Sequence, residues 1–340
     1  MARLLRTILI VLVVGPGVAA AQSSGGAARV MLISSDGLRP DAIDRAGATV
    51  LQGLIAGGSY QATAVDELPS ITLPNHASMV TGLSIARHGV LINTDIPGRI
   101  TATTIFDVAT DAGLDVGFFI NKTKLGFLGE AEGVKVWKFT ADVDSLADEV
   151  IAAIESEDLR LFFIHFGDPD KTGHRDGWMS GPYLDAVRSV DAAIGRILDA
   201  LTAKGIRDET VLIITSDHGG HLNTHGFDIP DDRLIPFILN GPGIAVGRKL
   251  CNQVRIMDAA ATALDLLGLP AISAMDGRVV TEARADFEQP DCAAGAPPVG
   301  FPCITFPVLT LGPLVLFLAW HGRRSRRRRS ATTPNGPSAP

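Results

Sequence analysis

The sequence predicts an α/β fold in which a mostly parallel central sheet is flanked by helices. Short apolar runs, which suit strands buried on both faces, alternate with amphipathic stretches that suit helices. This alternation is typical of parallel α/β domains. Polar residues follow several of the runs directly, at the carboxyl ends of the predicted strands, where open α/β sheets gather functional groups.

Five apolar runs define predicted strands, and one long amphipathic stretch defines the clearest helix. The strands span residues 29–34, 116–120, 161–166, 211–215 and 236–239. In the helix, predicted over residues 183–203, apolar side chains recur at helical spacing: Val187, Val190, Ile194, Ile197, Leu198 and Leu201. Length and unbroken patterning favour a single domain within residues 22–288.

The N-terminus is typical of an export signal. Two arginines precede an apolar run over residues 7–14, and three alanines before Gln22 suit a cleavage site. We therefore expect a signal peptide over residues 1–21. The alternative, an uncleaved anchor helix, needs a longer apolar run, because about 20 residues are required to span a bilayer.

The C-terminus carries a second apolar segment, residues 301–320, which is followed by six arginines within residues 323–329. An apolar segment of about 20 residues can cross a bilayer, and clustered arginine stays on the cytoplasmic side. We expect residues 289–300 to be a linker, 301–320 a transmembrane segment and 321–340 a basic cytoplasmic tail. The domain would then be exported to a bacterial periplasm or cell surface and anchored in the membrane. Alternatively, the tail resembles bacterial C-terminal sorting signals, which a sorting protease removes.

Charge is distributed unevenly along the chain. The formal net charge is −7, and Arg3, Arg6 and the six tail arginines contribute +8, so the remainder carries −15. Such an acidic domain lacks the lysine- and arginine-rich surface on which nucleic acid polymers bind. A small phosphorylated substrate stays compatible, because bound divalent metals reverse the local field.

The three cysteines allow two readings. Cys303 lies at the edge of the C-terminal apolar segment, which leaves Cys251 and Cys292. These two either form a disulfide in an oxidising compartment or remain free thiols, and the sequence leaves both alternatives open.

Carboxylates and imidazoles gather at the ends of three predicted strands. Five such residues are Asp36, Asp170, His174, Asp217 and His218. Unpaired charges that meet at one sheet edge are costly to bury, so a divalent metal between them is the simplest explanation. One further histidine, His221 or His225, lies downstream. Oxygen and imidazole ligands without a thiolate suit zinc, or manganese in a looser site.

The segment from Ser70 to His76 opens another predicted helix. Pro74 suits the first turn, which places Thr72 at the helix N-terminus, where free N–H groups and the helix dipole favour anions. A hydroxyl at that place can lose its proton to metal coordination and attack phosphorus. The simpler alternative is that Thr72 or Ser70 only caps the helix.

Taken in order, these motifs resemble those of the type I phosphodiesterase and nucleotide pyrophosphatase branch of the alkaline phosphatase superfamily. The matching segments are Thr-x-Pro-Asn-His at residues 72–76, Ser-Asp-His-Gly at 216–219 and the His-Gly pair at 225–226. The resemblance covers nearly the whole domain and implies an alkaline-phosphatase-like sandwich. It also implies that Thr72 is the nucleophile of a phosphothreonine intermediate and that Asn93 binds the phosphoryl oxygens.

Two divalent metal ions, with zinc as the first expectation, are part of what the resemblance implies. The ligands of the first would be Asp36, Asp217 and His218, and those of the second Asp170, His174 and His225. Thr72 would bridge to the first ion. His225 is preferred to His221 because its His-Gly pair matches the family pattern.

Lys122 and Lys124 follow the strand at residues 116–120. They are similar to a Lys-x-Lys element of monoesterase and phosphonoacetate-hydrolase relatives, and two ammonium groups there would hold a second anionic group of the substrate. The alternative is an ordinary solvated loop. The chain is also shorter than the larger nucleotide pyrophosphatases, so we expect their substrate-shaping insertions to be absent.

These features support a ranked set of functions. The first is a two-metal phosphodiesterase or pyrophosphatase, and the second is a phosphomonoesterase or phosphonate hydrolase that uses Lys122 and Lys124. A sulfatase is disfavoured, because Thr72 and His76 replace the Cys or Ser and the Arg of a Cys/Ser-x-Pro-x-Arg element. A non-catalytic metal-binding surface module is the alternative from another class, and the presence of every predicted ligand argues against it.

Overall fold

The computed structural model describes residues 27–129, 133–288 and Cys292. The predicted signal peptide, transmembrane segment and basic tail lie outside these residues, as does almost all of the predicted linker. In the part of the chain that is described, no helix has the length and apolar character needed to cross a membrane.

One sheet of eight strands forms the centre of the domain, in the order β4-β3-β5-β1-β6-β7-β2-β8. The strands are β1 Arg29–Ser35, β2 Ser59–Val65, β3 Val116–Ile120, β4 Val136–Phe139, β5 Leu161–Phe166, β6 Thr210–Thr215, β7 Leu234–Asn240 and β8 Arg248–Lys249. β7 pairs antiparallel with both β6 and β2, and all other neighbours are parallel. The mostly parallel sheet is confirmed, and all five predicted strands belong to it.

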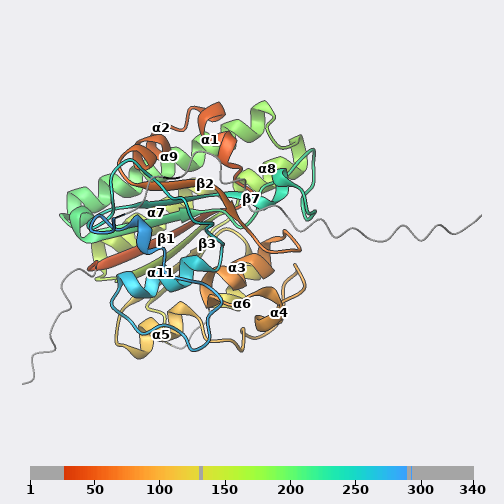
Figure 1. The fold of residues 1–340 in the computed structure, drawn as a ribbon. Coiled ribbons are helices and arrows are strands. Elements are labelled where there is room, and N and C mark those ends of the chain that lie inside the picture. The colour runs from red at the N-terminus through yellow and green to blue at the C-terminus, as the bar shows by residue number, and fades with distance from the viewer. Residues whose placement is uncertain (1–26, 130–132, 289–291, 293–340) are drawn as a thin grey trace, which may run out of the picture. The chain divides into compact units, whose positions relative to one another are not determined.

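Helices cover both faces of this sheet (Figure 1). They are α1 Pro40–Ala46, α2 Thr49–Ala56, α3 Thr72–Thr81, α4 Ile85–His88, α5 Ile105–Asp111, α6 Gly126–Gly129, α7 Val143–Ser156, α8 Asp168–Asp176, α9 Gly181–Lys204, α10 Pro230–Arg233 and α11 Asp258–Leu266. The core on one face takes side chains from α1, α2, α7 and α9, and the core on the other from α3, α5 and α11. The two helical layers on either side of one sheet form the α/β sandwich that the sequence predicted.

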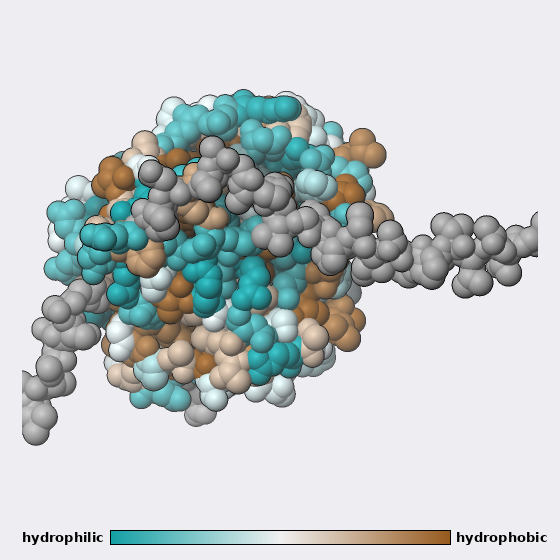
Figure 2. Space-filling model, in the orientation of Figure 1, coloured by the Kyte–Doolittle hydropathy of each residue, from teal (hydrophilic) through white to brown (hydrophobic). Residues whose placement is uncertain are grey.

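Strand β1 shows why the predicted strands read as continuous apolar runs. Val30 and Leu32 enter one core, while Met31 and Ile33 enter the other, and all four side chains are fully buried. A strand covered on both faces needs no polar side, so its sequence loses the alternation of a half-exposed strand. On the face drawn in Figure 2, hydrophilic and apolar residues are interspersed on the surface.

Helix α9 confirms the predicted amphipathic helix and extends it slightly at both ends. The Ser180 side chain accepts a hydrogen bond from the Tyr183 amide and caps the first turn. Gly205 ends the helix in the left-handed conformation that glycine adopts without strain. Between these caps, Val187, Val190 and Ile194 belong to the apolar face that packs on the sheet.

Cys251 and Cys292 form a disulfide, with their Cα atoms 5.4 Å apart. This resolves the alternative that the sequence left open. The bond joins Cys292, within the predicted linker, to the segment that follows β8, and disulfides of this kind persist in oxidising compartments.

The strand register brings three carboxyl ends together. In the parallel pairs, Ser35 of β1 lies opposite Phe166 of β5, and Ser34 lies opposite Thr215 of β6. The residues that follow these strands therefore meet at one edge of the sheet, which is where the polar motifs of the sequence fall.

Candidate two-metal centre

The first predicted ligand group, called here the first triad, consists of Asp36, Asp217 and His218. Asp36 follows β1, and the other two residues follow β6. The Nε2 atom of His218 lies 3.5 Å from Asp36 Oδ1 and 3.3 Å from Asp217 Oδ2. One ligand atom from each residue lies within 4.8 Å of the other two, and all three residues are buried. The spacing suits a single ion.

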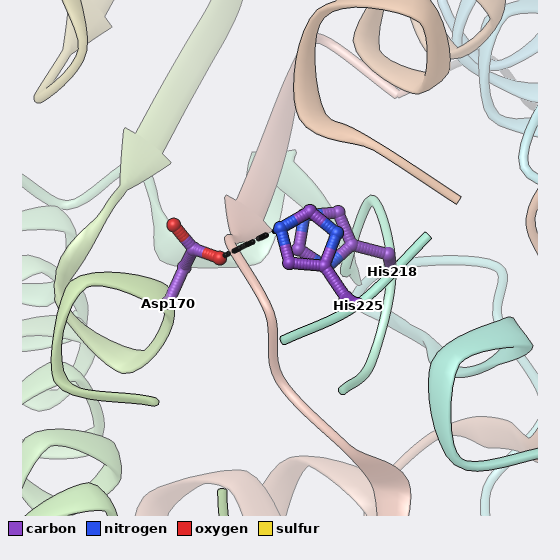
Figure 3. Close-up of side chains that lie close together, drawn as sticks. All are labelled: Asp170, His218 and His225. Atoms are coloured by element: carbon purple, nitrogen blue, oxygen red, sulfur yellow. Dashed lines mark ion pairs between the residues drawn. The ribbon is translucent and has the colours of Figure 1, made fainter. Parts of the chain in front are cut away.

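The second triad consists of Asp170 and His174, both on α8, and His225 from the loop after β6. Asp170 Oδ1 lies 3.4 Å from the Nε2 atom of His174 and 3.5 Å from that of His225. Figure 3 shows Asp170 facing His225, which stacks on His218 with ring centroids 3.7 Å apart. His218 is also within ligand reach of Asp170 and His225, so it stands between the two triads.

His221 does not join either triad. Its Nδ1 atom lies 2.7 Å from Asp232 Oδ1, and Asp232 also accepts a hydrogen bond from the Phe227 amide. This pair holds the loop that carries His225. Of the two downstream histidines, the structure brings His225 to the cluster.

Each imidazole of the two triads presents an unprotonated Nε2 atom. The Nδ1 atoms of His174, His218 and His225 lie 3.0, 2.8 and 2.7 Å from the backbone carbonyls of Asn223, Gly219 and Ser70. A carbonyl only accepts, so each Nδ1 atom carries a proton, and in the neutral ring each Nε2 atom then keeps a lone pair. This is the tautomer that binds metal through Nε2.

Three buried carboxylate oxygens lack a hydrogen-bond partner among the described residues: Asp36 Oδ1, Asp170 Oδ1 and Asp217 Oδ2. An unsatisfied buried acceptor is rare and costs about 1–3 kcal/mol or more when it is charged. These are the same oxygens that face the imidazole Nε2 atoms. The donor set therefore fits two divalent cations, and its oxygen and nitrogen character suits zinc or manganese.

Burial shapes the ionisation of the centre. Burial and the neighbouring Asp36 carboxylate raise the pKa of Asp217 to about 7. For Asp36, burial acts in the same direction, but Lys122, His165 and His218 outweigh it and hold the pKa well below its ordinary value. Burial and the nearby His218 lower the pKa of His225 to about 4, which keeps its imidazole neutral. A neutral imidazole is the form that ligates metal.

Lys122 contacts one carboxylate of each triad. Its Nζ atom lies 2.8 Å from Asp36 Oδ2 and 2.5 Å from Asp170 Oδ2. The ammonium pairs with the Oδ2 atom of each carboxylate and leaves the Oδ1 atom without a hydrogen-bond partner among the described residues. Lys122 was expected to bind substrate or to lie in a solvated loop, and the structure instead places it against the metal-facing carboxylates.

Two histidines to which the sequence assigned no role at the centre also support it. His165, on β5, accepts the Asn121 amide at Nδ1, so its Nε2–H donates to Asp36 Oδ2 at 2.8 Å. His76 lies between Ser34 Oγ and the Thr72 carbonyl, at 2.9 Å from each. Both histidines are fully buried. For His165 the signal is a histidine within a buried strand run, whereas His76 lies on α3 and carries no such signal.

Thr72 is the first residue of α3, as predicted. The residue before the helix is Ile71, and no side chain caps the first turn, so the capping alternative for Thr72 and Ser70 is wrong. Thr72 Oγ1 instead lies 3.5 Å from His218 Nε2 of the first triad. The Ser70 hydroxyl donates to Asp66 and to the Asp232 carbonyl.

Asn93 lies beside the N-terminus of α3. Its Oδ1 atom accepts hydrogen bonds from the Leu73 amide at 3.0 Å and from Lys124 Nζ at 2.9 Å. Two donors on one oxygen fix the amide orientation, so the Nδ2 protons point elsewhere. Asn93 and Lys124 line a cavity of about 410 Å³ together with Thr94, Asp95, Asn121, Lys122, Thr123 and Phe139.

The sequence matches one established family. A profile of the type I phosphodiesterase/nucleotide pyrophosphatase family matches residues 30–237. Among similar curated proteins is human ectonucleotide pyrophosphatase/phosphodiesterase family member 7, which is 29% identical over an alignment of 242 residues that covers 63% of this chain and 53% of that protein. The rat protein of the same name is also 29% identical, over 56% of this chain and 49% of its own length. The chain thus spans about half the length of these relatives.

Solved structures show the same fold. Murine ectonucleotide pyrophosphatase/phosphodiesterase 5, in complex with AMP, superposes with a TM-score of 0.66 at 16% identity and covers 75% of this chain and 99% of its own. A 2-O GAG sulfatase superposes with a TM-score of 0.63 at 14% identity and covers 77% of this chain and 75% of its own. The family match includes all six residues of the two triads, and this chain belongs to the type I phosphodiesterase/nucleotide pyrophosphatase family.

Proposed function

We propose that this protein is a two-metal phosphoester hydrolase that acts through Thr72 and prefers phosphodiesters or nucleotide pyrophosphates. One observation carries the proposal. The three unpartnered carboxylate oxygens face imidazole Nε2 atoms, and one of these atoms, His218 Nε2, lies 3.5 Å from the Thr72 hydroxyl. Family membership supports the same reaction class.

In this proposal Thr72 Oγ1 attacks the phosphorus in line with the leaving group. The new bond joins Oγ1 to phosphorus, the bond to the leaving oxygen breaks and the leaving group departs, and the hydroxyl proton passes to solvent water. Water then attacks the phosphothreonine, which restores the hydroxyl and releases the phosphoryl product. Two divalent cations, held by the two triads, would supply the positive charge that stabilises the alkoxide and the phosphoryl oxygens. Thr72 lies at a helix N-terminus, which adds free N–H groups and a favourable dipole.

Asn93 has the geometry of a phosphoryl-binding residue. Because its Oδ1 atom is held by Leu73 and Lys124, its Nδ2 protons remain for a substrate oxygen. Preorganised donors of this kind contribute because they need no reorganisation when charge develops. The adjoining cavity would receive the substituent that a diester carries beyond the reacting phosphorus.

The charges around the centre support the diester. Lys122 is already paired with two carboxylates, so it brings no free positive charge to a substrate. A monoester dianion has one more negative charge than a diester. Among the described residues that line the cavity, Lys124 is the candidate partner for that additional negative charge.

A monoester or phosphonate substrate is the second candidate, and one observation favours it. The Lys124 ammonium lines the cavity beside Asn93, where it could hold a second anionic group. Both candidates use the same metal centre and the same nucleophile.

A substrate panel on the full-length protein tests the proposal. Bis-p-nitrophenyl phosphate, a dinucleoside pyrophosphate and p-nitrophenyl phosphate would be compared after chelation and after stepwise return of zinc or manganese. We expect activity only with metal and faster turnover of the diesters. Metal-dependent turnover that favours the monoester would support the second candidate, and hydrolysis that is indifferent to chelation would contradict both.

We also propose that the domain acts outside the cytoplasm, tethered by residues 301–320. The disulfide between Cys251 and Cys292 supports this location, since such bonds are rare in the cytosol. The predicted export signal and the predicted transmembrane segment would supply the route and the anchor.

A further inference from the structure

Trp178 lies directly against the second triad. Its side chain is only 7% exposed. Its ring meets those of His174 and His225 edge to face, at centroid distances of 5.1 and 5.8 Å. We propose that Trp178 positions the two imidazoles of the second triad and that its indole emission reports whether this triad holds a metal ion.

Trp178 is held by hydrogen bonds from its indole and from its backbone amide to two segments that carry predicted metal ligands. Its Nε1–H donates to the Gly37 carbonyl at 3.0 Å, and Gly37 follows Asp36 of the first triad. The Trp178 amide donates to the Leu222 carbonyl at 2.7 Å, in the loop that carries His225. Ligands that come from separate segments keep their geometry only if the surrounding shell holds those segments together. Trp178 makes that connection.

Two glycines show that the ligand-bearing segments are shaped around the indole. A Cβ atom at Gly173, next to His174, would lie 2.7 Å from Trp178. At Gly220, in the loop between His218 and His225, it would lie 2.1 Å from the same ring. Distances below about 3 Å are not tolerated between carbon atoms, so both backbones approach the indole as closely as glycine allows. Edge-to-face contacts then set the orientation of the imidazole rings.

This inference rests on the proposed two-metal function and adds a positioning role for Trp178. Replacing Trp178 by phenylalanine removes the bond to Gly37 and shortens the ring that supports the imidazoles. Loss of a supporting residue typically costs about 10- to 100-fold in metal affinity. We expect that loss at one of two zinc sites, because Trp178 packs on the imidazoles of the second triad, whereas Asp36 of the first triad has its own support from His165.

The test follows tryptophan emission and bound zinc while chelator-treated full-length protein is titrated with zinc. Trp137, which is 41% exposed on the edge strand β4, supplies the matched control. In Trp137→Phe the emission change should persist and both sites should bind zinc as in the wild type. In Trp178→Phe the emission change should vanish, and one zinc should bind about 10- to 100-fold more weakly.

The possible outcomes separate this inference from the proposed function. Wild-type protein that binds no zinc would overturn the two-metal function itself. If the wild type binds two ions, then unchanged affinities in Trp178→Phe, or an equal loss at both sites, would overturn the positioning role. If Trp178→Phe fails to fold, the Trp137→Phe titration still tests the proposal, because an emission that does not change with zinc would refute the claim that Trp178 reports on metal binding.

Discussion

The Nε2 atoms of His174 and His225 lie 3.1 Å apart, although each imidazole also has a backbone carbonyl at its Nδ1 atom. With both protons on Nδ1, two lone pairs face one another. That arrangement is repulsive unless a cation or a proton lies between the rings, and burial keeps the pKa of His225 low, at about 4. The pair therefore favours a metal ion at neutral pH.

The first prediction compares two histidines of the same loop. His225→Ala removes one ligand of the second triad, whereas His221→Ala removes only the partner of Asp232. We expect His225→Ala to lose one of two bound zinc ions and nearly all activity, because a two-metal reaction needs both charges. His221→Ala should keep both ions. Elemental analysis after gel filtration measures this, and the reverse pattern would show that His221 is the ligand.

The second prediction concerns the nucleophile. Thr72→Ala should lower turnover of every phosphoester by roughly 10³-fold or more, since a covalent route cannot proceed without its nucleophile. Thr72→Ser keeps a hydroxyl at the same helix position and should retain measurable activity. Acid-quenched wild-type reactions should yield a phosphorylated peptide that contains residue 72. Full turnover by Thr72→Ala would mean that water attacks the substrate directly.

The sequence predicted the polar residues of the centre more completely than it predicted the strands. Asp36, Asp170 and Asp217 could be identified because each follows a strand that is buried on both faces and therefore reads as an uninterrupted apolar run. The strands β2, β4 and β8 were not predicted. Strand β2 mixes buried and exposed positions without strict alternation, β4 is largely exposed, and β8 has only two residues. None of them carries a periodic signal.

Contacts between segments distant in sequence account for the remaining omissions. The sequence alone could not show that Lys122 would meet Asp36 and Asp170, because that contact depends on β3 lying beside β5 and β5 beside β1. The roles of His165 and His76 depend on the same assembly. The capping alternative for Thr72 failed for a local reason: the chain enters α3 through Ile71 in an extended conformation, which leaves the Thr72 hydroxyl free to face His218.

A third prediction separates positioning from substrate binding at Lys124. If Lys124 acts by holding the Asn93 amide, Lys124→Ala should lower kcat for diesters and monoesters by a similar factor, about 10-fold. Asn93→Ala should cost more, about 10²- to 10³-fold, as loss of a phosphoryl-binding donor does. Steady-state kinetics on both substrate classes provide the measurement. A loss confined to monoesters would assign Lys124 to a second anionic group and favour the alternative substrate.

The fourth prediction uses His88, which lies outside the metal centre. Its Nδ1 atom accepts the Val90 amide, and its Nε2 atom lies 3.0 Å from Ser78 Oγ. Burial lowers its pKa from the ordinary 6.5 to about 4. Between these two pH values the unfolded chain binds the proton more readily, so the stabilising contribution is complete above pH 6.5 and is lost as the pH falls toward 4.

His88→Gln should flatten this part of the stability curve. Urea unfolding of the chelator-treated protein, repeated at several pH values from 7 to 4, measures the slope, and chelation keeps metal release out of the comparison. We expect the wild type to lose more stability across the window than the variant. Equal slopes would place the titrating groups elsewhere in the protein.

The last prediction concerns the side of the membrane on which the domain acts. With a cleaved signal peptide and clustered arginines after residue 320, the domain that contains Thr72 should face outward. Protease added to intact spheroplasts should then digest the domain, and non-reducing peptide mapping should recover Cys251 linked to Cys292. A cytoplasmic marker enzyme must stay intact as the control. A domain that is protected until the membrane is permeabilised, with both cysteines recovered as free thiols, would place the catalytic centre inside. In that case the apolar C-terminal segment would insert in the opposite sense, with its arginines outside, against the positive-inside bias that supports the present orientation.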